Sequence, residues 1–494
     1  MTQKITIARE AGFSLAGFIA GQGFRFFFNL VVASLLGPDS LGAYALTLAV
    51  IQIAEVVAVG GLDAGVLRFV NLHERQPDKQ QGIVAAALKS SLLLSLPLAV
   101  LIIVFSGFLS SLVAGGNLLR LMLVSYACSV PFHVFIAVAG HAVQAHKKLL
   151  PRVIAGQILV PGGMLLFFVL IYMVSGGVPA LLIALPLSAF AGFVWIWKAL
   201  RFNTGVSAGD IVRAKPEKEM ARYARPLLVV ACMGMVSHWL DILMLGWYAG
   251  IETVGLYQPA VRTAGLMRSV LLAVAGITAP IIAGMHGRGE RDEMEKLLRI
   301  VTRWVMIAAI PLAVVLMVMP ATVLGLFGTV FTVASPVLIV LAAAVLVQSF
   351  FGLLDTVLQM TGYPKLCAIN AAAGLVVHVA LNLLLIPSYG MIGAAWGLLL
   401  VYLLLGIARA VEVRVFLDMH SFSWSLLKPL VAGVVSGLAL LSVKPLLAGL
   451  SVAATLGGGM LLVLVIYLLL VRLMKLEQEE MEVILKLFSF VIKR

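Results

Sequence analysis

The chain has 494 residues, of which 62% are hydrophobic and 12% are charged, and its mean hydropathy is +1.10. A water-soluble protein of this length could not bury so much apolar surface, so the composition excludes soluble globular classes and indicates an integral membrane protein. The net charge of +13 would be typical of a protein that binds nucleic acid, but the basic residues cluster in every second gap between apolar runs. That pattern is a membrane-topology signal, and we predict no nucleic-acid partner.

The apolar runs are about twenty residues long, which is the length of a helix that crosses roughly 30 Å of hydrocarbon. The ~10-residue alternating segments of a membrane barrel do not occur in the sequence. We therefore predict an all-α polytopic membrane protein with about fourteen transmembrane helices. In chain order the predicted spans are 12–35, 41–66, 84–107, 118–142, 152–174, 178–199, 226–248, 255–284, 300–319, 334–360, 364–386, 391–416, 425–443 and 448–471.

The gaps between the spans alternate in charge. On one side lie basic segments such as "RFVNLHERQPDK" and "KALRFNTGVSAGDIVRAKPEKEMARYAR"; on the other lie "GPDS", "AGIET" and "PSYG". The second set carries only Lys444, with Arg120 at the mouth of one span. The positive-inside rule then places both termini in the cytoplasm, and an even number of spans agrees with termini on one side. We expect a multi-pass protein of the cytoplasmic (inner) membrane.

Two sequence stretches occur twice at nearly the same separation. "LGPDSLGAY" at 36–44 is echoed by "AGIETVGLY" at 249–257, and "VQAHKKLLPR" at 143–152 by "LQMTGYPKLC" at 358–367. We predict two pseudo-symmetric six-helix bundles in parallel orientation, which suits an alternating-access transporter with its site between the halves. The expected parts are listed in chain order: a bundle at 1–200, a basic cytoplasmic linker at 201–225, a second bundle at 226–418, two additional helices at 419–472, and an amphipathic cytoplasmic tail at 473–494.

The repeated turns suggest a gate on the outer rim. Gly37-Pro38 and Gly250 each lead into a glycine-marked helix start, at Gly42 and Gly255. Glycine allows tight turns and close helix approach, and proline fixes φ. The two turns would approach one another when the cavity faces the cytoplasm and separate when it opens outward. The alternative is that each turn is only a compact hairpin.

Three arginines lie inside predicted spans, where charge is costly and needs a reason. Arg25 falls near the middle of the first span, and Arg262 and Arg268 lie below the outer end of the eighth. A guanidinium stays charged and binds phosphate in a bidentate fork, so a cavity with such groups would attract a diphosphate. The alternative is that each arginine snorkels or neutralises a neighbouring acid, for which Glu55 and Asp241 are the candidates.

Four acids are candidates for coupling or gating: Glu55, Asp63, Asp241 and Asp355. Asp63 and Asp355 lie at the cytoplasmic ends of their spans, where gate or cap contacts are favoured over ion coupling. We predict no metal site and no cofactor. No nucleophile–base set or Walker lysine occurs in the loops, and the longest cytoplasmic loop has about 28 residues, which is too short for an ATPase domain. The chain is therefore not expected to be an enzyme.

Longer segments of the sequence resemble a known family. "ASLLGPDSLGAYALTLAV" followed by "VGGLDAGVLRFV" resembles the opening of the polysaccharide-repeat flippases of the multidrug/oligosaccharidyl-lipid/polysaccharide exporter superfamily. The second half agrees, most specifically in "LDTVLQMTGYPKLCAINAAAGLVVHVALNLLLIPSYGMIGAAWGLLL". The resemblance covers roughly residues 12–420. It implies two six-helix bundles plus two further helices and a cationic lumen, for which Arg25, Arg262 and Arg268 are the matching positions.

The resemblance implies a flippase that moves undecaprenyl-diphosphate-linked oligosaccharides across the bacterial inner membrane for O-antigen (lipopolysaccharide), capsule or exopolysaccharide synthesis. Its partners would be the lipid-linked oligosaccharide, membrane lipids and the polymerase or chain-length proteins of the pathway. Three alternatives stay open. A drug/cation antiporter of the same superfamily would need acids in the cavity more than arginines, and a lipid II flippase would have an arginine in mid-span 2 that this chain lacks. The third is a non-transporting scaffold of a polysaccharide assembly complex.

Overall fold

The computed structural model describes residues 2–474 except positions 114, 421, 423, 448 and 450. Residues 475–494 of the predicted amphipathic tail lie outside this range. The chain forms two compact units, Met1–Gln258 and Pro259–Arg494, and each is described by itself. The predicted division into bundles at 1–200 and 226–418 rests on the repeats and stays a prediction.

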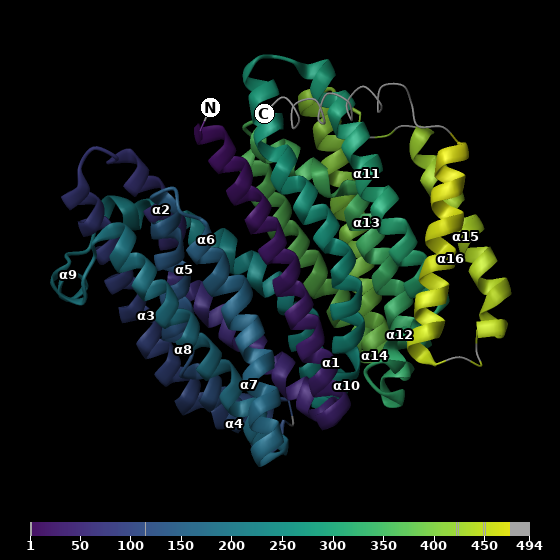
Figure 1. Cartoon of the computed structure of the whole chain (residues 1–494), viewed down its shortest axis with the longest axis horizontal. Helices are drawn as coiled ribbons and strands as arrows, with labels where there is room; N and C mark the ends of the chain where they lie inside the picture. Colours follow the sequence, from purple (N-terminus) through teal and green to yellow (C-terminus); the bar gives the residue numbers. More distant parts are fainter. Residues whose placement is uncertain are drawn as a thin grey trace. The chain divides into compact units, whose positions relative to one another are not determined.

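The first unit is built from helices (Figure 1). They are α1 (Thr2–Val59), α2 (Leu62–Leu72), α3 (Pro77–Leu112), α4 (Gly116–Ala127), α5 (Val130–Ala145), α6 (Leu150–Val153), the π-helix η1 (Ile154–Leu159), α7 (Val160–Ser175), α8 (Gly177–Thr204), α9 (Ala208–Arg213) and the first part of α10 (Lys218–Gly287). Most of these helices are apolar on all sides, as membrane spans are. The points at which the chain reverses direction therefore mark where one span ends and the next begins.

Two of these helices are too long for one crossing, and each contains a single-residue break. If straight, the 58 residues of α1 would extend about 87 Å, but Gly37 breaks α1 with φ 76° and ψ −174°. The rings of Phe28 and Tyr44, on either side of the break, have centroids 5.0 Å apart, whereas sixteen residues of straight helix would separate them by about 24 Å. The element therefore folds back as a hairpin and holds the predicted span 12–35 and most of the predicted span 41–66.

The same break occurs in α10, at Gly250 with φ 80° and ψ 177°. Here the Tyr257 hydroxyl donates a hydrogen bond to Asp241 Oδ2 over 3.3 Å. Asp241 and Tyr257 stand 213 positions after Phe28 and Tyr44, so the sequence repeat corresponds to the same hairpin built twice.

Two predicted spans differ from the observed helices. The span 41–66 is interrupted because Gly60 and Gly61 adopt positive φ, which only glycine takes readily, and the chain continues as α2 to Leu72. The span 118–142 is formed by α4 and α5, which are bent by 41°. The bend precedes Pro131, which cannot donate a backbone hydrogen bond to the preceding turn.

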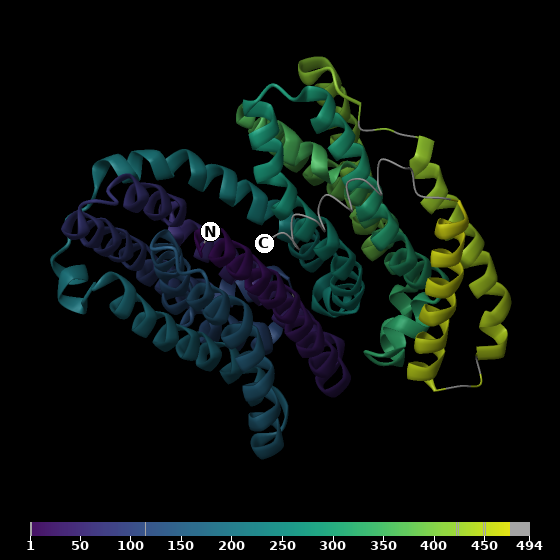
Figure 2. The ribbon, with the colours of Figure 1, turned by 45° about the horizontal axis from the view of Figure 1, so that its top comes forward.

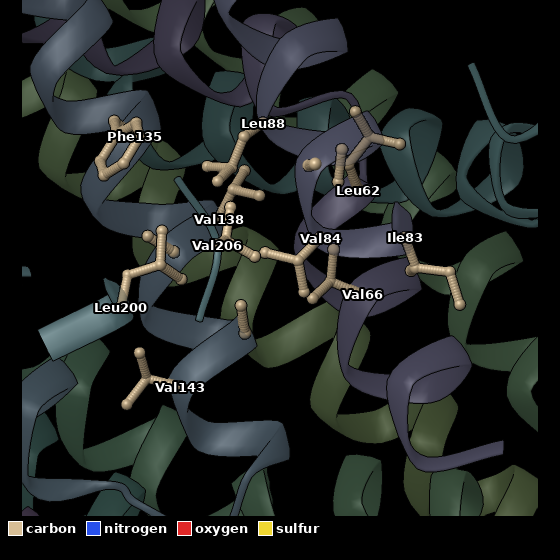
Figure 3. Packing of buried hydrophobic residues seen from close by; sticks show 14 of the residues in the cluster. Leu62, Val66, Ile83, Val84, Leu88, Phe135, Val138, Val143, Leu200 and Val206 are labelled. Atoms are coloured by element: carbon tan, nitrogen blue, oxygen red, sulfur yellow. The ribbon is translucent and has the colours of Figure 1, made fainter. Parts of the chain in front are cut away.

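The core of the first unit lies where α2, α3, α5 and α8 meet (Figure 3). Aliphatic side chains from these four helices interlock there, and Val206 of the following turn closes the cluster. The labelled members are Leu62, Val66, Ile83, Val84, Leu88, Phe135, Val138, Val143, Leu200 and Val206. Because lipid offers little hydrophobic drive between helices, this tight packing supplies the contacts that hold the bundle together.

The second unit continues α10 and adds α11 (Arg291–Val318), α12 (Pro320–Gly325), the 3₁₀ helix η2 (Thr329–Ala334), α13 (Ser335–Met360), α14 (Pro364–Leu417), the 3₁₀ helix η3 (Trp424–Leu426), α15 (Leu427–Leu447) and α16 (Val452–Leu473). The 54-residue α14 is another hairpin, broken at Gly390 with φ 55°. A Cβ on Gly374 would lie 2.6 Å from Leu405 Cδ1, so its two arms lie against each other.

The last two helices, α15 and α16, lie side by side against α11 (Figures 1 and 2). Small residues allow the close approach: a Cβ on Gly433 would lie 2.4 Å from Ile310 Cγ2, and one on Gly459 would lie 2.8 Å from Met319 Sδ. These helices therefore belong to the second unit.

Eleven apolar helical segments of the described chain can cross a membrane when the bent α4–α5 pair is counted as one. Three of these segments, 12–72, 218–287 and 364–417, each hold two predicted spans because of the breaks at Gly37, Gly250 and Gly390. The structure thus accommodates the fourteen predicted spans, and the chain is a multi-pass membrane protein.

Candidate functional site

The two repeated turns pack against one another within the first unit. A Cβ on Gly42 would lie 2.0 Å from the carbonyl oxygen of Ile251, and a Cβ on Gly255 would lie 1.9 Å from that of Pro38. Gly42 and Gly255 are equivalent in the repeat, as are Pro38 and Ile251, so the contact is reciprocal. The predicted approach of the two turns is confirmed, and only glycine fits at its two centres.

The first part of α10 follows α1 and α2 along their length. Towards the turns, a Cβ on Gly246 would lie 2.7 Å from Leu46 Cδ2, and further along Trp239 Nε1 donates a hydrogen bond to Gln52 Oε1 over 3.2 Å. At the other end, a Cβ on Gly61 would lie 2.6 Å from the carbonyl oxygen of Ala224. Glycines on both partners therefore bring the helix backbones close together from one end to the other.

Arg25 lies in the first arm of α1, half-buried, as expected for a cation inside a span. Its Nη1 donates a hydrogen bond to Oε1 of Gln157 in η1 over 3.2 Å. The carbonyl of Arg25 accepts a hydrogen bond from Asn29 Nδ2 over 2.7 Å. One contact of the guanidinium is thus a neutral amide, which positions the group without cancelling its charge.

Glu55, a candidate acid under the alternative in which the buried arginines are neutralised, lies in the second arm of α1 beside a histidine. Its Oε1 is 3.7 Å from Nδ1 of His133 in α5, and the side chains of Glu55 and His133 are 20% and 18% exposed. The Arg25 charge is near enough to act on the same imidazole. Sequence reasoning missed His133, whose only signal was a polar residue in the apolar run "VPFHVFIAV".

Asp63 lies at the start of α2, and its Oδ2 is 3.9 Å from Nε2 of His141 in α5. Beside this pair, the guanidinium of Arg152 hydrogen bonds to Gln144 Oε1 and interacts electrostatically with Asp63. This cluster joins α2, α5 and α6 by side-chain contacts, and the gate or cap role of Asp63 stays a prediction.

Asp241 is the one predicted coupling acid that is nearly buried, with 8% of its surface exposed. The hydrogen bond from Tyr257 ties it to the far arm of the α10 hairpin.

Arg262 and Arg268 lie beyond the unit boundary, in the second unit, and both are half-buried. Nε of Arg268 is buried and has no hydrogen-bond partner among the described residues. Sequence reasoning missed a further cation in this unit, Arg303 of α11, which is only 4% exposed. A joint site of Arg25, Arg262 and Arg268 stays a prediction.

Asp355 of α13 forms an ion pair with Arg409 of α14, with Oδ1 and Nη2 3.2 Å apart. Its other oxygen, Oδ2, accepts a hydrogen bond from Gln359 Nε2 over 2.7 Å. A second polar contact lies nearby in sequence, where Asn370 Nδ2 donates to Glu412 Oε2 over 2.7 Å. Arg409 and Glu412 were missed, although their three-residue spacing within a predicted span was a signal of a polar helix face.

Comparison with known proteins gives one family and several relatives. A family model described as "polysaccharide biosynthesis protein" matches residues 31–336. A probable low-salt glycan biosynthesis flippase of Haloferax volcanii is 25% identical over 384 residues, which cover 76% of this chain and 77% of that protein. The succinoglycan biosynthesis transport protein ExoT of Rhizobium meliloti is 22% identical over 341 residues, or 68% and 66% of the two chains.

Among solved structures, the fold is similar to that of a lipid II flippase, MurJ, in an inward closed conformation. The TM-score is 0.73 at 14% identity, and the match covers 98% of this chain and 99% of that chain. At this identity the likeness concerns the fold alone.

Proposed function

Because the chain belongs to the polysaccharide biosynthesis protein family, we propose that it is a flippase for lipid-linked oligosaccharides. It moves undecaprenyl-diphosphate-linked repeat units across the bacterial inner membrane by alternating access, with both termini in the cytoplasm. The product then passes to the polymerase and chain-length proteins of surface polysaccharide synthesis. The glycan and polysaccharide transport described by the names of its relatives supports this substrate class.

The observation that carries the proposal is Arg25. An ionisable residue inside a membrane span marks a candidate functional site. Gln157, which accepts a hydrogen bond from its Nη1, is neutral, so this contact leaves the positive charge of the guanidinium intact. A diphosphate carries the complementary charge and accepts the paired hydrogen bonds that a guanidinium donates. We propose the same role for Arg268, whose Nε is buried and has no hydrogen-bond partner among the described residues.

The contact between the repeated turns supports an outer gate at these positions. In this arrangement the backbones around Gly42 and Gly255 touch, which would close the outer rim while the substrate enters from the cytoplasmic side. Separation of the two turns would then open the path outward. Glu55 with His133, Asp63 with His141, and the Asp355–Arg409 pair would be the groups that couple or gate this exchange.

The test uses the purified protein in liposomes that carry a fluorescent polyprenyl-diphosphate oligosaccharide. The expected result is protein-dependent transfer of the label to the opposite leaflet, lost in Arg25→Ala and Arg268→Ala and partly restored by lysine, which keeps the charge without the fork. Arg213→Ala, on the exposed surface of α9, is the control.

The alternatives give different results in the same liposomes. Transport of a cationic dye with no lipid transfer would mean a drug/cation antiporter, and transfer of lipid II alone would mean a lipid II flippase. A scaffold would transfer none of these substrates. Normal transfer by both alanine variants would refute the role of the arginines.

A further inference from the structure

The span that faces Arg25 contains a π-helical turn, η1, between α6 and α7. Such turns are rare, carry one extra residue relative to an α-helical turn, and occur frequently at functional sites. The backbone of α1 approaches η1 closely: a Cβ on Gly21 would lie 2.7 Å from the carbonyl oxygen of Gln157. One turn earlier, a Cβ on Gly17 would lie 2.2 Å from Val153 Cγ1. Gly17 and Gly21 therefore leave this face of α1 without side chains, and the π-turn packs closely against it.

Arg25 follows Gly21 by one helical turn on the same face of α1. The Oε1 atom of Gln157 is 3.2 Å from Arg25 Nη1 and would lie 2.8 Å from a Cβ on Gly21. The amide thus occupies the space that the missing side chain of Gly21 leaves and reaches the guanidinium from there. Three features converge on this contact: the π-turn, the glycine face and the hydrogen bond.

The chemistry of the acceptor matters for an anionic ligand. A glutamate at this position would pair with Arg25 and remove the net charge that attracts a phosphate. A leucine would leave the charge but remove this hydrogen bond, which gives the long side chain of Arg25 more rotamer freedom. Glutamine fixes one N–H of the five that arginine has and keeps the charge.

We propose that Gln157 is a positioning residue for the diphosphate site, and that the π-turn of η1 is the element that directs its side chain to Arg25. This inference rests on the proposed function, in which Arg25 binds the diphosphate of the lipid-linked substrate. Loss of one residue from the π-turn would turn the preceding helix by about 100° relative to the following one and carry Gln157 away from Arg25.

The experiment measures binding of farnesyl diphosphate, a short polyprenyl diphosphate, to the full chain in lipid nanodiscs by isothermal titration calorimetry. Gln157→Leu should weaken binding by a factor of roughly 10 to 150, the effect of losing a hydrogen bond to a charged group. Gln157→Glu should weaken it more than Gln157→Leu does, because the new carboxylate pairs with Arg25 and cancels the charge that attracts the diphosphate. This order of affinities is not expected if Gln157 only fills space, since glutamate has nearly the same shape as glutamine.

A pair of variants tests the π-turn. Deletion of Gly156 should weaken binding as much as Gln157→Leu does, whereas Gly156→Ala should not, because a Cβ there has no atom within 4 Å. The swap of Arg25→Gln with Gln157→Arg should bind better than Arg25→Gln alone, since it returns a guanidinium to the same contact. This rescue keeps the proposal testable even if the deletion variant fails to fold.

The results distinguish the positioning role of Gln157 from the binding of diphosphate by Arg25. If Arg25→Ala weakens binding and Gln157→Leu does not, the positioning role is wrong and the proposed site stands. If neither variant changes binding, Arg25 does not hold the diphosphate, and both the inference and that part of the proposed function are wrong. Equal affinity of Gln157→Glu and Gln157→Leu would also overturn the inference.

Discussion

Replacement of Gly255 by alanine tests whether the paired turns form a gate. The new Cβ would lie 1.9 Å from the carbonyl oxygen and 2.6 Å from the carbonyl carbon of Pro38. Real Cβ contacts are essentially never shorter than 3.0 Å, so the turns would have to separate by about 1 Å. The opposing atoms belong to the backbone, and no side-chain rotation can relieve the overlap. Overpacking of this kind costs about 1–3 kcal/mol.

This free-energy cost destabilises the arrangement in which the turns touch and leaves the open arrangement unaffected. The ratio of open to closed molecules should therefore rise by a factor of roughly 5 to 150. The assay is the labelling rate of Ser40→Cys by an impermeant maleimide from outside, in a chain whose three native cysteines are replaced. Ser40 is 6% exposed with the turns in contact, so labelling reports the open state.

Gly265→Ala, later in the same helix, is the matched control because a Cβ there meets no atom within 4 Å. We expect it to leave the labelling rate unchanged. A Gly255→Ala protein that folds normally but labels at the control rate would refute the assignment of these turns as a gate.

Three further results are expected. Oxidation of the pair Ser40→Cys and Thr253→Cys should cross-link the turns and stop transport reversibly; a cross-link that leaves transport intact would show that the turns are only connectors. A cysteine at Ser175 should react with an impermeant thiol reagent from outside whereas one at Ser207 should not, and outside labelling at Ser207 in intact cells would reverse the topology. Lys89→Met should speed tryptic cleavage of the linker around α9. Lys89 Nζ donates hydrogen bonds to the backbone carbonyls of Val212 and Ala214, at the end of that helix, over 2.7 and 2.9 Å. An unchanged cleavage rate would mean that these hydrogen bonds do not hold the linker in place.

The sequence predicted the number and order of spans because membrane length and hydropathy leave little freedom. It also located the hairpins: the predicted turns contain Gly37, Gly250 and Gly390, whose positive φ only glycine adopts easily. The break at Gly60 and Gly61 was missed, because two glycines inside an apolar run resemble the small residues of a helix interface.

Side-chain partners could not be predicted, since they depend on which helix faces meet. Arg25 and Gln157 are separated by 132 positions, and no local pattern links them. The π-turn that joins them has no sequence signature, because it is defined by one extra residue in the backbone hydrogen-bond ladder. Glu55 was one candidate partner for a buried arginine, and the structure places it beside His133, to which no local sequence pattern links it.

The reciprocal contact between the two turns has a bearing on the origin of the chain. Gly42 packs on the carbonyl of Ile251 as Gly255 packs on that of Pro38, so each half offers the same patch to the other. A self-complementary contact of this kind is the one that two identical subunits make across a two-fold axis. A half-length ancestor with this turn could have closed on a second copy of itself as a homodimer, and duplication followed by fusion would have kept the contact in a single chain. Divergence could then place Phe28 in one half and Asp241 at the equivalent position of the other without disturbing the paired glycines.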